Sequence, residues 1–220
     1  MNVKLVSYSK PADEFLEEGL ENVQDLIAFC AKVSNPTAQI NKETSERLIK
    51  YLIKHQHWSP LEMVNAVLEI NTTRDIAHQI VRHRSFAFQE FSQRYANPEE
   101  QGDMFEYSEA RLQDPKNRQN SVEVEDAKLQ QEWDWAQRRI AVLAKKEYDW
   151  AIKKGIAKEQ PRKVLPEGLT KTRLYMNGTL RSWVHYIELR GANGTQKEHM
   201  DIAHECAKII AEIFPLMKTL

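Results

Sequence analysis

The sequence predicts a mixed α/β protein of the α+β class, a single domain in which helices flank a central twisted sheet. Segments that alternate apolar and polar residues lie among segments that repeat apolar residues at helical spacing. No regular strand–helix–strand alternation is visible, which argues against a parallel, doubly wound sheet. The length of 220 residues suits one domain, residues 1–220, with one insertion.

The N-terminal quarter is expected to form one strand and two helices. Residues 2–8 alternate enough for an edge or half-buried strand. Residues 21–34 repeat apolar positions at helical spacing until Asn35-Pro36 ends the pattern. Residues 42–55 form a second helical segment. Its buried side is predicted to carry Leu48, Tyr51 and Leu52.

The middle of the chain predicts a strand that leads directly into a helix. Residues 61–73 alternate and are rich in branched side chains, as strands are. Thr72 or Thr73 is expected to cap a helix over residues 74–84. The apolar face of this helix is formed by Ile76, Ala77, Ile80 and Val81.

A polar excursion at about residues 97–121 precedes a long helix, which is expected from about residue 122 to residue 157. Loops as long as the excursion are often lids or binding segments, although a merely decorative loop fits the pattern equally well. The helix has two apolar faces, and it is therefore buried twice, either within its own chain or against another subunit. One face carries Trp133, Ala136, Ile140, Leu143 and Tyr148, and the other carries Trp135, Val142 and Trp150.

The last fifty residues predict a strand and two helices. Residues 171–191 change from a strand-like to a helical pattern, with Asn177-Gly178 at the switch. Residues 197–214 form a final helix with a broad apolar face.

Composition restricts the kinds of ligand that the chain can bind. Lys plus Arg total 31 against 32 Asp plus Glu, so a general nucleic-acid or membrane-surface binder is not expected and any basic patch is local. There is no signal peptide core and no run approaching the ~20 apolar residues of a membrane span. Cys30 and Cys206 lie in apolar helical patterns, which favours a reducing cytoplasm as the location.

Several common sites are absent from the sequence. The seven glycines form no GxGxxG or phosphate-loop pattern, so arginines and helix-end amides must hold any phosphate. No HExxH motif occurs. His199 and His204 are five residues apart, about 140° around a helix, so they point to different faces and do not form a pair of metal ligands. No metal site is expected.

The stretch "RHRSFAFQEFSQRY", residues 82–95, combines arginines with aromatic rings. One interpretation is structural: the first three residues close a helix, where cations complement the dipole, and the phenylalanines are core. The second is a ligand site. In an extended segment Glu90, Ser92 and Arg94 share a face. A hydroxyl beside a guanidinium binds phosphate well. Glu90 then requires a hydroxyl or imide donor, and such a combination indicates a nucleotide.

The same residues carry a resemblance to a known family. Arg82-His83-Arg84, seven residues and then Ser92 form an RHR-x7-S signature, followed by Gln93-Arg94-Tyr95, which resembles the flavin-dependent thymidylate synthases. Further stretches agree in the expected order, namely residues 31–34, 57–62, 162–166, 178–182 and 188–190. The resemblance spans nearly the whole chain except the excursion.

This resemblance implies an enzyme that makes dTMP from dUMP, with methylenetetrahydrofolate as one-carbon donor and NADPH as reductant acting through FAD. It also implies a homotetramer whose active sites are shared between subunits. The residues implied for FAD are Ser59, Arg82, His83, Arg84, Glu90, Thr179, Leu180, Arg181 and His185. Those implied for dUMP are Gln79, Arg82, Glu90, Phe91, Ser92, Gln93, Arg94, Arg162 and Arg190. His57 is implied to lie near the flavin and the folate.

The chain departs from the usual family pattern at four positions. Ala87 and Gln89 stand where Ser and Asn are usual, and Thr179 and His185 stand where Asn is frequent. None of the four belongs to the RHR-x7-S frame. The two FAD contacts at Thr179 and His185 are therefore the ones most open to change.

Two interpretations compete for Arg190 and for the chain as a whole. Arg190 either complements the end of a helix ahead of Gly191 or stabilises negative charge on the uracil ring, which would replace a cysteine nucleophile because both cysteines look buried. The alternative to an enzyme is a non-enzymatic nucleotide- or RNA-binding module. The bases of the bound nucleotide or RNA would stack on Phe86, Phe88 and Phe91.

Overall fold

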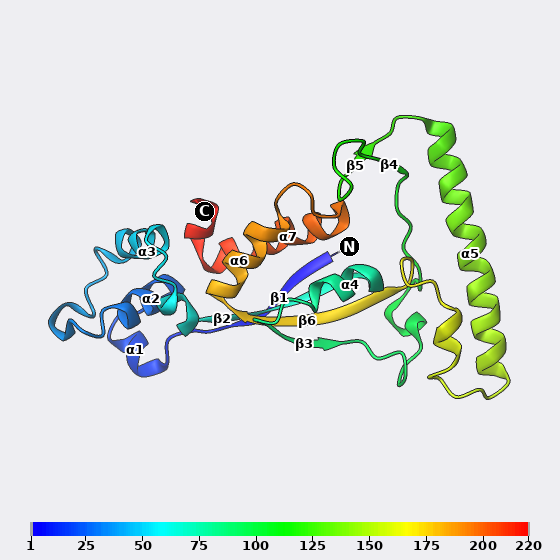
Figure 1. Ribbon diagram of the computed structural model, residues 1–220. Helices are drawn as coiled ribbons and strands as arrows, with labels where there is room; N and C mark the ends of the chain where they lie inside the picture. Colours follow the sequence, from blue (N-terminus) through cyan, green and yellow to red (C-terminus); the bar gives the residue numbers. More distant parts are fainter. Residues whose placement is uncertain (1, 220) are drawn as a thin grey trace.

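A four-stranded antiparallel sheet forms the centre of the computed structural model, which describes residues 2–219 (Figure 1). The strands are β1 (Asn2–Tyr8), β2 (Asn65–Thr73), β3 (Ala87–Glu90) and β6 (Lys171–Thr179), in the spatial order β1-β2-β6-β3. β2 and β6 pair along their whole length, from Asn65 opposite Thr179 to Thr73 opposite Lys171. The mixed α+β prediction is confirmed, and β1 is an edge strand as expected.

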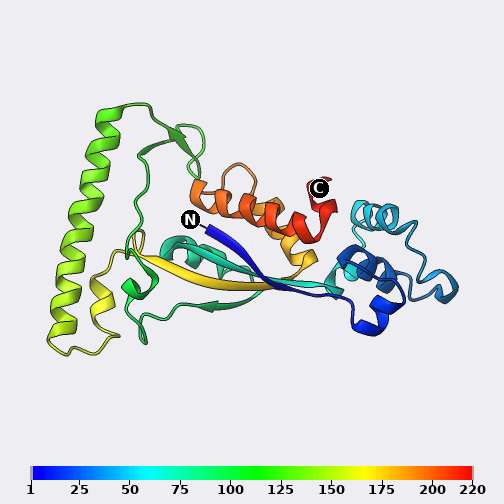
Figure 2. The same cartoon turned by 180° about the vertical axis from the view of Figure 1, so that it is seen from behind.

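Three helices cover one face of this sheet: α4 (Arg74–Ile80), α6 (Leu180–Arg190) and α7 (Lys197–Ile213) (Figures 1 and 2). Alternate residues of the two central strands, among them Leu68, Ile70 and Met176, are fully buried beneath them. Trp183 of α6 is also fully buried and donates its indole N–H to the Ala66 carbonyl at 3.1 Å. The strand-to-helix switch falls at Thr179, close to the predicted place.

A group of short helices lies at one end of the sheet: α1 (Asp13–Glu17), α2 (Val23–Ala31) and α3 (Ser45–Lys54). The prediction for the buried side of α3 is wrong in part, because Ile49 and Leu52 enter the core whereas Tyr51 is 52% exposed. Neighbouring helical residues point about 100° apart, so Tyr51 cannot share the face of Leu52. Its ring lies instead 4.2 Å from that of His55, the next residue on its own face.

The long helix α5 (Ala127–Lys153) stands at the opposite end, beside the sheet rather than on it (Figure 1). It is shorter than predicted. Asp126 caps it by accepting the N–H groups of Lys128 and Leu129 at 2.9 and 3.1 Å, and residues 121–123 form a strand instead. That strand, β5 (Ser121–Glu123), pairs with β4 (Arg111–Gln113), so the excursion contains a hairpin and a 3-10 turn at Pro98–Gln101.

The inner face of α5 differs from the predicted stripe. Only Tyr148 of that stripe is buried, together with Gln137, Ala141, Ala144 and Ala151. The alanines let the helix lie close to its neighbours, and the Gln137 amide bonds both the N–H and the carbonyl of Ser108, at 3.0 and 2.9 Å. Between 43% and 70% of the surface of the large apolar residues on the other faces is exposed, namely Trp133, Trp135, Ile140, Val142, Leu143 and Trp150.

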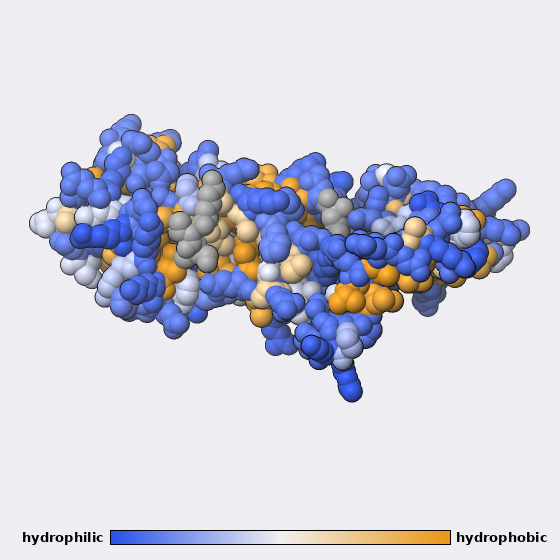
Figure 3. All heavy atoms as spheres, turned by 90° about the horizontal axis from the view of Figure 1, so that it is seen from above, coloured by the Kyte–Doolittle hydropathy of each residue, from blue (hydrophilic) through white to orange (hydrophobic). Residues whose placement is uncertain are grey.

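The surface is otherwise mainly polar. Seen from above, hydrophilic side chains cover most of the molecule and apolar ones gather in patches (Figure 3). Within residues 2–219, none of the helices combines the length and the apolar character that crossing a membrane requires.

Candidate active site

The arginine stretch begins in the turn that joins α4 to β3. α4 ends at Ile80, so Arg82 and Arg84 lie beyond the helix instead of closing it. Both are exposed, and within residues 2–219 neither guanidinium forms an ion pair. Two unpaired guanidinium groups in one turn suit the binding of an anion.

Between these two arginines, His83 points inward and holds Arg190. The Arg190 Nε–H donates to His83 Nε2 at 2.9 Å. Because a guanidinium has no acceptor, His83 Nε2 must carry a lone pair, and the ring is neutral with its proton on Nδ1. Burial, with Arg190 as the second cause, lowers the pKa of His83 to about 4.

This contact favours the ligand-binding interpretation of Arg190 over the helix-capping one. The guanidinium turns toward His83 rather than toward the last carbonyls of α6, which a capping arginine would approach. No other hydrogen bond to the Arg190 guanidinium is found in the described part of the chain, so its two terminal nitrogens keep their donors available. The side chain is therefore preorganised for a planar, two-point contact with an acceptor ligand.

The half-buried Gln79 amide lies in a second contact group. It donates to Gln196 Oε1 at 2.8 Å, and its own Oε1 is 3.2 Å from Nδ1 of His199. The side chain of His199 is fully buried and also lies 3.1 Å from the Tyr186 hydroxyl. Sequence reasoning considered His199 only as a metal ligand and missed this contact. The signal available was a histidine on the apolar face of a helix.

Five of the residues implied for FAD, namely Ser59, Thr179, Leu180, Arg181 and His185, lie at or near the start of α6, whereas Glu90 lies elsewhere, beside Arg74 and Thr172. Thr179 caps α6 by accepting the Ser182 N–H at 3.2 Å, and Arg181 forms an ion pair with Glu62. His185 contacts the Trp58 ring edge-on, 4.5 Å between centroids, and Ser59 follows that tryptophan on an exposed 3-10 turn. Leu180 differs from its neighbours, because its side chain is fully buried and its N–H donates to the Val64 carbonyl at 2.9 Å.

Phe86 connects this corner to the arginine turn. A Cβ on Gly178 would lie 2.3 Å from the Phe86 ring, so only glycine permits the ring to pack directly on β6. The ring also lies edge-on to Trp183 at 4.9 Å, and Ser182 donates its hydroxyl to the Ser85 carbonyl at 3.2 Å. Phe86 is thus partly buried and packs against the core, which weakens the alternative in which its ring stacks on a base.

The expected shared face of Glu90, Ser92 and Arg94 is wrong. β3 ends at Glu90, and the chain then turns, with the Tyr95 N–H bonded to the Ser92 carbonyl at 3.1 Å. A period of two holds only in extended backbone, so the three side chains diverge. Glu90 instead accepts hydrogen bonds from Arg74 at 3.1 Å and from the Thr172 hydroxyl at 2.9 Å.

A basic pocket of about 280 Å³ lies beside this turn. Its lining is Arg74, His78, Gln93, Arg162, Lys163, Leu165 and Glu167. Gln93 is 4% exposed, and its Nε2 is buried with no hydrogen-bond partner among the residues that the structure describes. A buried amide donor without an acceptor is costly unless a ligand supplies one. Arg74 is already paired with Glu90, but Arg162 and Lys163 form no ion pair within residues 2–219. Two unpaired cationic side chains and an unpartnered N–H suit a phosphate group.

The structure divides the implied dUMP residues between two sides of α4. His78 faces the basic pocket, whereas Gln79, one residue on and therefore about 100° around the helix, faces α7. Arg190 lies on the side of Gln79, because it contacts His83, whose ring is 6.3 Å from that of His199, the partner of Gln79. Arg162 lines the same pocket as His78. No hydrogen bond or ion pair within residues 2–219 links the two groups.

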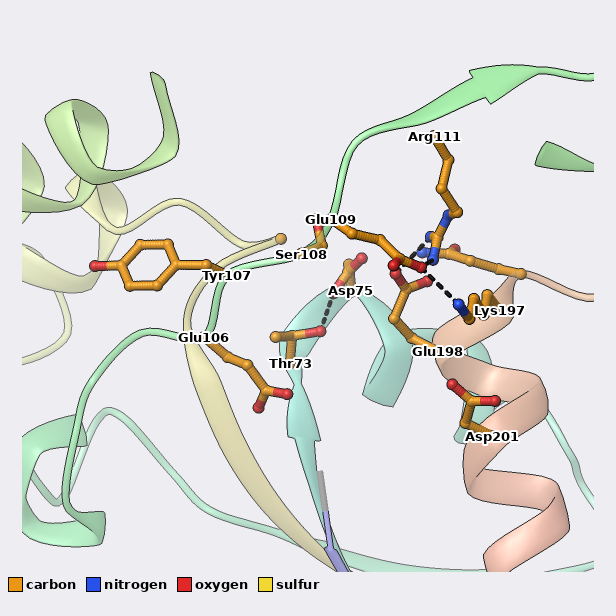
Figure 4. Close-up of a pocket in the computed structure, with 12 residues that line it drawn as sticks. Thr73, Asp75, Glu106, Tyr107, Ser108, Glu109, Arg111, Lys197, Glu198 and Asp201 are labelled. Carbon is orange, nitrogen blue, oxygen red and sulfur yellow. Dashed lines mark hydrogen bonds and ion pairs between the residues drawn. The ribbon is translucent and has the colours of Figure 1, made fainter. Parts of the chain in front are cut away.

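A further pocket of about 290 Å³ lies between the starts of α4 and α7 and the segment 106–111 (Figure 4). None of the implied site residues lines it. Its cations are already paired, Arg111 with Glu198 and Lys197 with Glu109 at 2.7 Å. The hydrogen bond from Lys197 is the main cause that lowers the pKa of Glu109. This pocket therefore has no unpaired cation for a phosphate.

Neither cysteine lies in a setting that favours a thiolate. Cys206 is fully buried, and burial raises the pKa of its thiol. Cys30 is half-buried rather than buried as expected, and partial burial raises the pKa of its thiol too. Among residues 2–219 there is no cluster of three side chains able to bind a metal ion.

Comparison with known proteins identifies the family of the chain. A family model described as "Thymidylate synthase complementing protein" matches residues 16–216. A probable flavin-dependent thymidylate synthase of Paramecium bursaria Chlorella virus 1 is 47% identical over 98% of this chain and 96% of its own length. A flavin-dependent thymidylate synthase of Synechocystis sp. is 45% identical over the same shares.

A solved structure has the same fold. The UMP/dUMP methylase PolB from Streptomyces cacaoi, bound with 5-Br dUMP, superposes with a TM-score of 0.78 over 98% of this chain and 92% of its own. Its sequence identity is 23%, so this likeness concerns the fold alone.

Proposed function

Since the chain belongs to the thymidylate synthase complementing protein family, with flavin-dependent thymidylate synthases as relatives, we propose that it methylates dUMP to dTMP with the help of FAD. Methylenetetrahydrofolate is the proposed one-carbon donor and NADPH the proposed reductant. The reaction belongs to nucleotide biosynthesis, for which a cytoplasmic location is the natural one.

The held guanidinium of Arg190 is the observation that carries this proposal. Methylation at C5 of uracil requires electron density at that carbon, and a negative charge then develops on the ring oxygens and N3. Arg190 is fixed through Nε by neutral His83, so its terminal nitrogens can donate to that charge. A preorganised donor of this kind stabilises a transition state by about 3–4 kcal/mol.

The basic pocket is the proposed seat of the dUMP phosphate. Arg162 and the unpartnered amide of Gln93 line it, and Arg94 and Ser92 lie in the adjoining turn. Because Arg190 and Gln79 lie on the other side of α4, one subunit would hold the phosphate while its neighbour holds the uracil. The division of the residues within one chain supports a shared site.

The corner between the arginine turn and the start of α6 is the proposed seat of FAD. Arg82 and Arg84 offer unpaired cations to its pyrophosphate, and Thr179, Arg181 and His185 line the start of α6 nearby. When bound, the flavin supplies the redox chemistry, and the residues around it determine its position. Leu180 contributes to this corner as a core residue beneath the turn.

The proposed mechanism uses no cysteine nucleophile. A nucleophilic thiol has to be ionised and accessible, and burial opposes both at Cys206. Activation of the uracil ring is assigned to Arg190 instead.

We propose a homotetramer in which the outer face of α5 contacts another subunit. Trp135, Val142 and Trp150 project from this face with 52%, 70% and 53% of their surfaces exposed. Exposed apolar residues concentrated on one helix mark an interaction surface.

The test is spectroscopic and then catalytic. Purified protein incubated with FAD should show flavin absorbance bands after removal of unbound flavin, and addition of dUMP should shift them. Supplied with methylenetetrahydrofolate and NADPH, it should then release dTMP. A protein that binds dUMP without ever retaining flavin would contradict the proposal and favour a non-enzymatic nucleotide-binding module.

A further inference from the structure

We propose that His199 is a positioning residue that fixes the side-chain amide of Gln79 so that an N–H group, and not the carbonyl, faces the nucleotide. This inference rests on the proposed function, because it assumes that Gln79 contacts dUMP. It assigns a buried residue of α7 to the site. It also states that Gln79 donates, rather than accepts, the hydrogen bond to dUMP.

The direction of the hydrogen bonds in this group follows from the hydroxyl of Tyr186. This side chain is 1% exposed, and His199 Nε2, at 3.1 Å, is the one hydrogen-bond partner of its hydroxyl in the described part of the chain. Burial raises the pKa of Tyr186 well above its ordinary value, so the hydroxyl keeps its proton. A buried O–H donor without an acceptor is costly, whereas an unused hydroxyl lone pair is not. The Tyr186 hydroxyl must therefore donate to His199.

That donation determines the state of His199. Its Nε2 accepts, so the proton of the neutral ring lies on Nδ1. The ring is neutral because burial, followed by the charge of Arg190 and the neighbouring His83, lowers the pKa of His199 to about 3. Nδ1–H then donates to the atom facing it, which is Oε1 of Gln79 at 3.2 Å.

The Gln79 amide is consequently locked. Its carbonyl oxygen faces His199, and one N–H donates to Gln196 Oε1 at 2.8 Å. The second N–H has no acceptor within residues 2–219, and the side chain is only half-buried, so this donor is available to a ligand. An acceptor oxygen of dUMP has the complementary chemistry, and the uracil ring is the part of dUMP that is proposed above to lie on this side of α4.

The experiment compares dUMP affinity in three variants of the FAD-loaded enzyme. His199→Leu removes the donor, and the Kd for dUMP should rise about tenfold, as expected for one lost hydrogen bond. His199→Asn can still donate to Gln79, so its Kd should stay near the wild-type value. Ile210→Val trims the same buried face of α7 away from the network and should leave the Kd unchanged.

A double-mutant cycle with Gln79→Ala identifies the route of the effect. If His199 acts through Gln79, adding His199→Leu to Gln79→Ala should weaken dUMP binding no further. Turnover at saturating dUMP and flavin content should remain near those of the parent enzyme, because the effect is on binding. Equal losses in both backgrounds, or a wild-type Kd in His199→Leu, would overturn the inference.

A measurement on the unmodified protein covers the case in which His199→Leu fails to fold. Nitrogen-15 NMR should show His199 as the neutral Nδ1–H tautomer from pH 5 to 8, and Tyr186→Phe should convert it to a mixture. An Nε2–H tautomer in the wild type would overturn the inference. If the wild type binds no dUMP at all, the proposed function fails, and the tautomer still tests the network.

The source of the acceptor oxygen is identified with deoxyuridine, which lacks the phosphate. If His199→Leu weakens deoxyuridine binding as much as dUMP binding, the oxygen lies on the nucleoside. If only dUMP binding is affected, it lies on the phosphate.

Discussion

The group around Arg190 and the helix α5 place polar and apolar side chains in opposite ways. Near Arg190, polar side chains are drawn into the interior, and His83 and His199 are each held by specific partners. On α5 the polar Gln137 is buried while Trp135 and Val142 face solvent. In the first region, the partners that hold the two histidines come from the same chain. The second exposes the kind of surface that a neighbouring subunit would cover.

The contrast predicts that chemistry is most sensitive at Arg190. Arg190→Ala should reduce dTMP formation about a hundredfold or more, because it removes about 3–4 kcal/mol of transition-state stabilisation. Arg190→Lys should restore little, since an ammonium cannot make a planar two-point contact. dTMP formation is measured alongside flavin content and NADPH oxidation. Near-normal dTMP synthesis in Arg190→Ala would leave only a helix-capping role.

The opposite result is expected on α5, where a substitution should affect assembly before chemistry. Val142→Asp combined with Trp135→Asp places two charges on the outer face, and sedimentation should then show smaller species. These should also lose flavin, because the site is expected to span subunits. Lys116→Asp, at the exposed tip of the β4–β5 hairpin, is the matched control and should change neither property. A fully active monomer would contradict both the interface and the shared site.

The two buried histidines make the Arg190 region sensitive to acid. Both folded-state pKa values, about 4 for His83 and about 3 for His199, lie below the ordinary value of about 6.5. As the pH falls below about 6.5, the unfolded chain takes up protons that the folded chain does not, so stability decreases toward the folded pKa values. At pH 5, His199 alone should account for about 2 kcal/mol.

Urea unfolding between pH 4.5 and 7.5 measures this effect. The variant His199→Asn cannot be protonated at this position and should show a shallower loss of stability over the same range. Identical pH dependence in the two proteins would mean that His199 is not buried and neutral.

The smallest effect on activity is expected at the cysteines, which lie neither in the group around Arg190 nor on α5. Replacing both Cys30 and Cys206 by alanine should cost about 1–3 kcal/mol of folding stability, mostly from the fully buried Cys206. Turnover per folded molecule should be largely intact. Complete loss of activity in a folded double variant would restore a thiolate mechanism.

The sequence was sufficient to predict the elements in which local pattern and burial coincide. The strands β1 and β6 alternate as expected because one face of the sheet lies under helices. The helices α6 and α7 repeat apolar residues as expected because one face of each packs on the sheet. It failed on α5, where periodicity marks where the apolar residues lie but not which face the rest of the chain covers. Small alanines and one glutamine form the inner face, and neither attracts attention in a hydrophobicity pattern.

The site could be predicted in part for a similar reason. The RHR-x7-S motif identified His83 and the matching stretch 188–190 identified Arg190, and the contact of the two side chains joins residues 107 positions apart. Residues that act through another side chain, such as His199, belong to no motif and emerge only from the packing of α7 against α4. The turn after Glu90 also escaped prediction, because the residues 91–95 contain no glycine or proline to mark it.

The division of the implied dUMP residues by α4 has a genetic consequence. If each site combines the Arg162 side of one subunit with the Arg190 side of another, then Arg162→Ala and Arg190→Ala damage different halves of a site. Randomly mixed and reassembled, two such inactive proteins would form about a quarter of their sites from two intact halves. Two defective copies of the gene in one cell could therefore complement each other, although neither encodes a working enzyme alone.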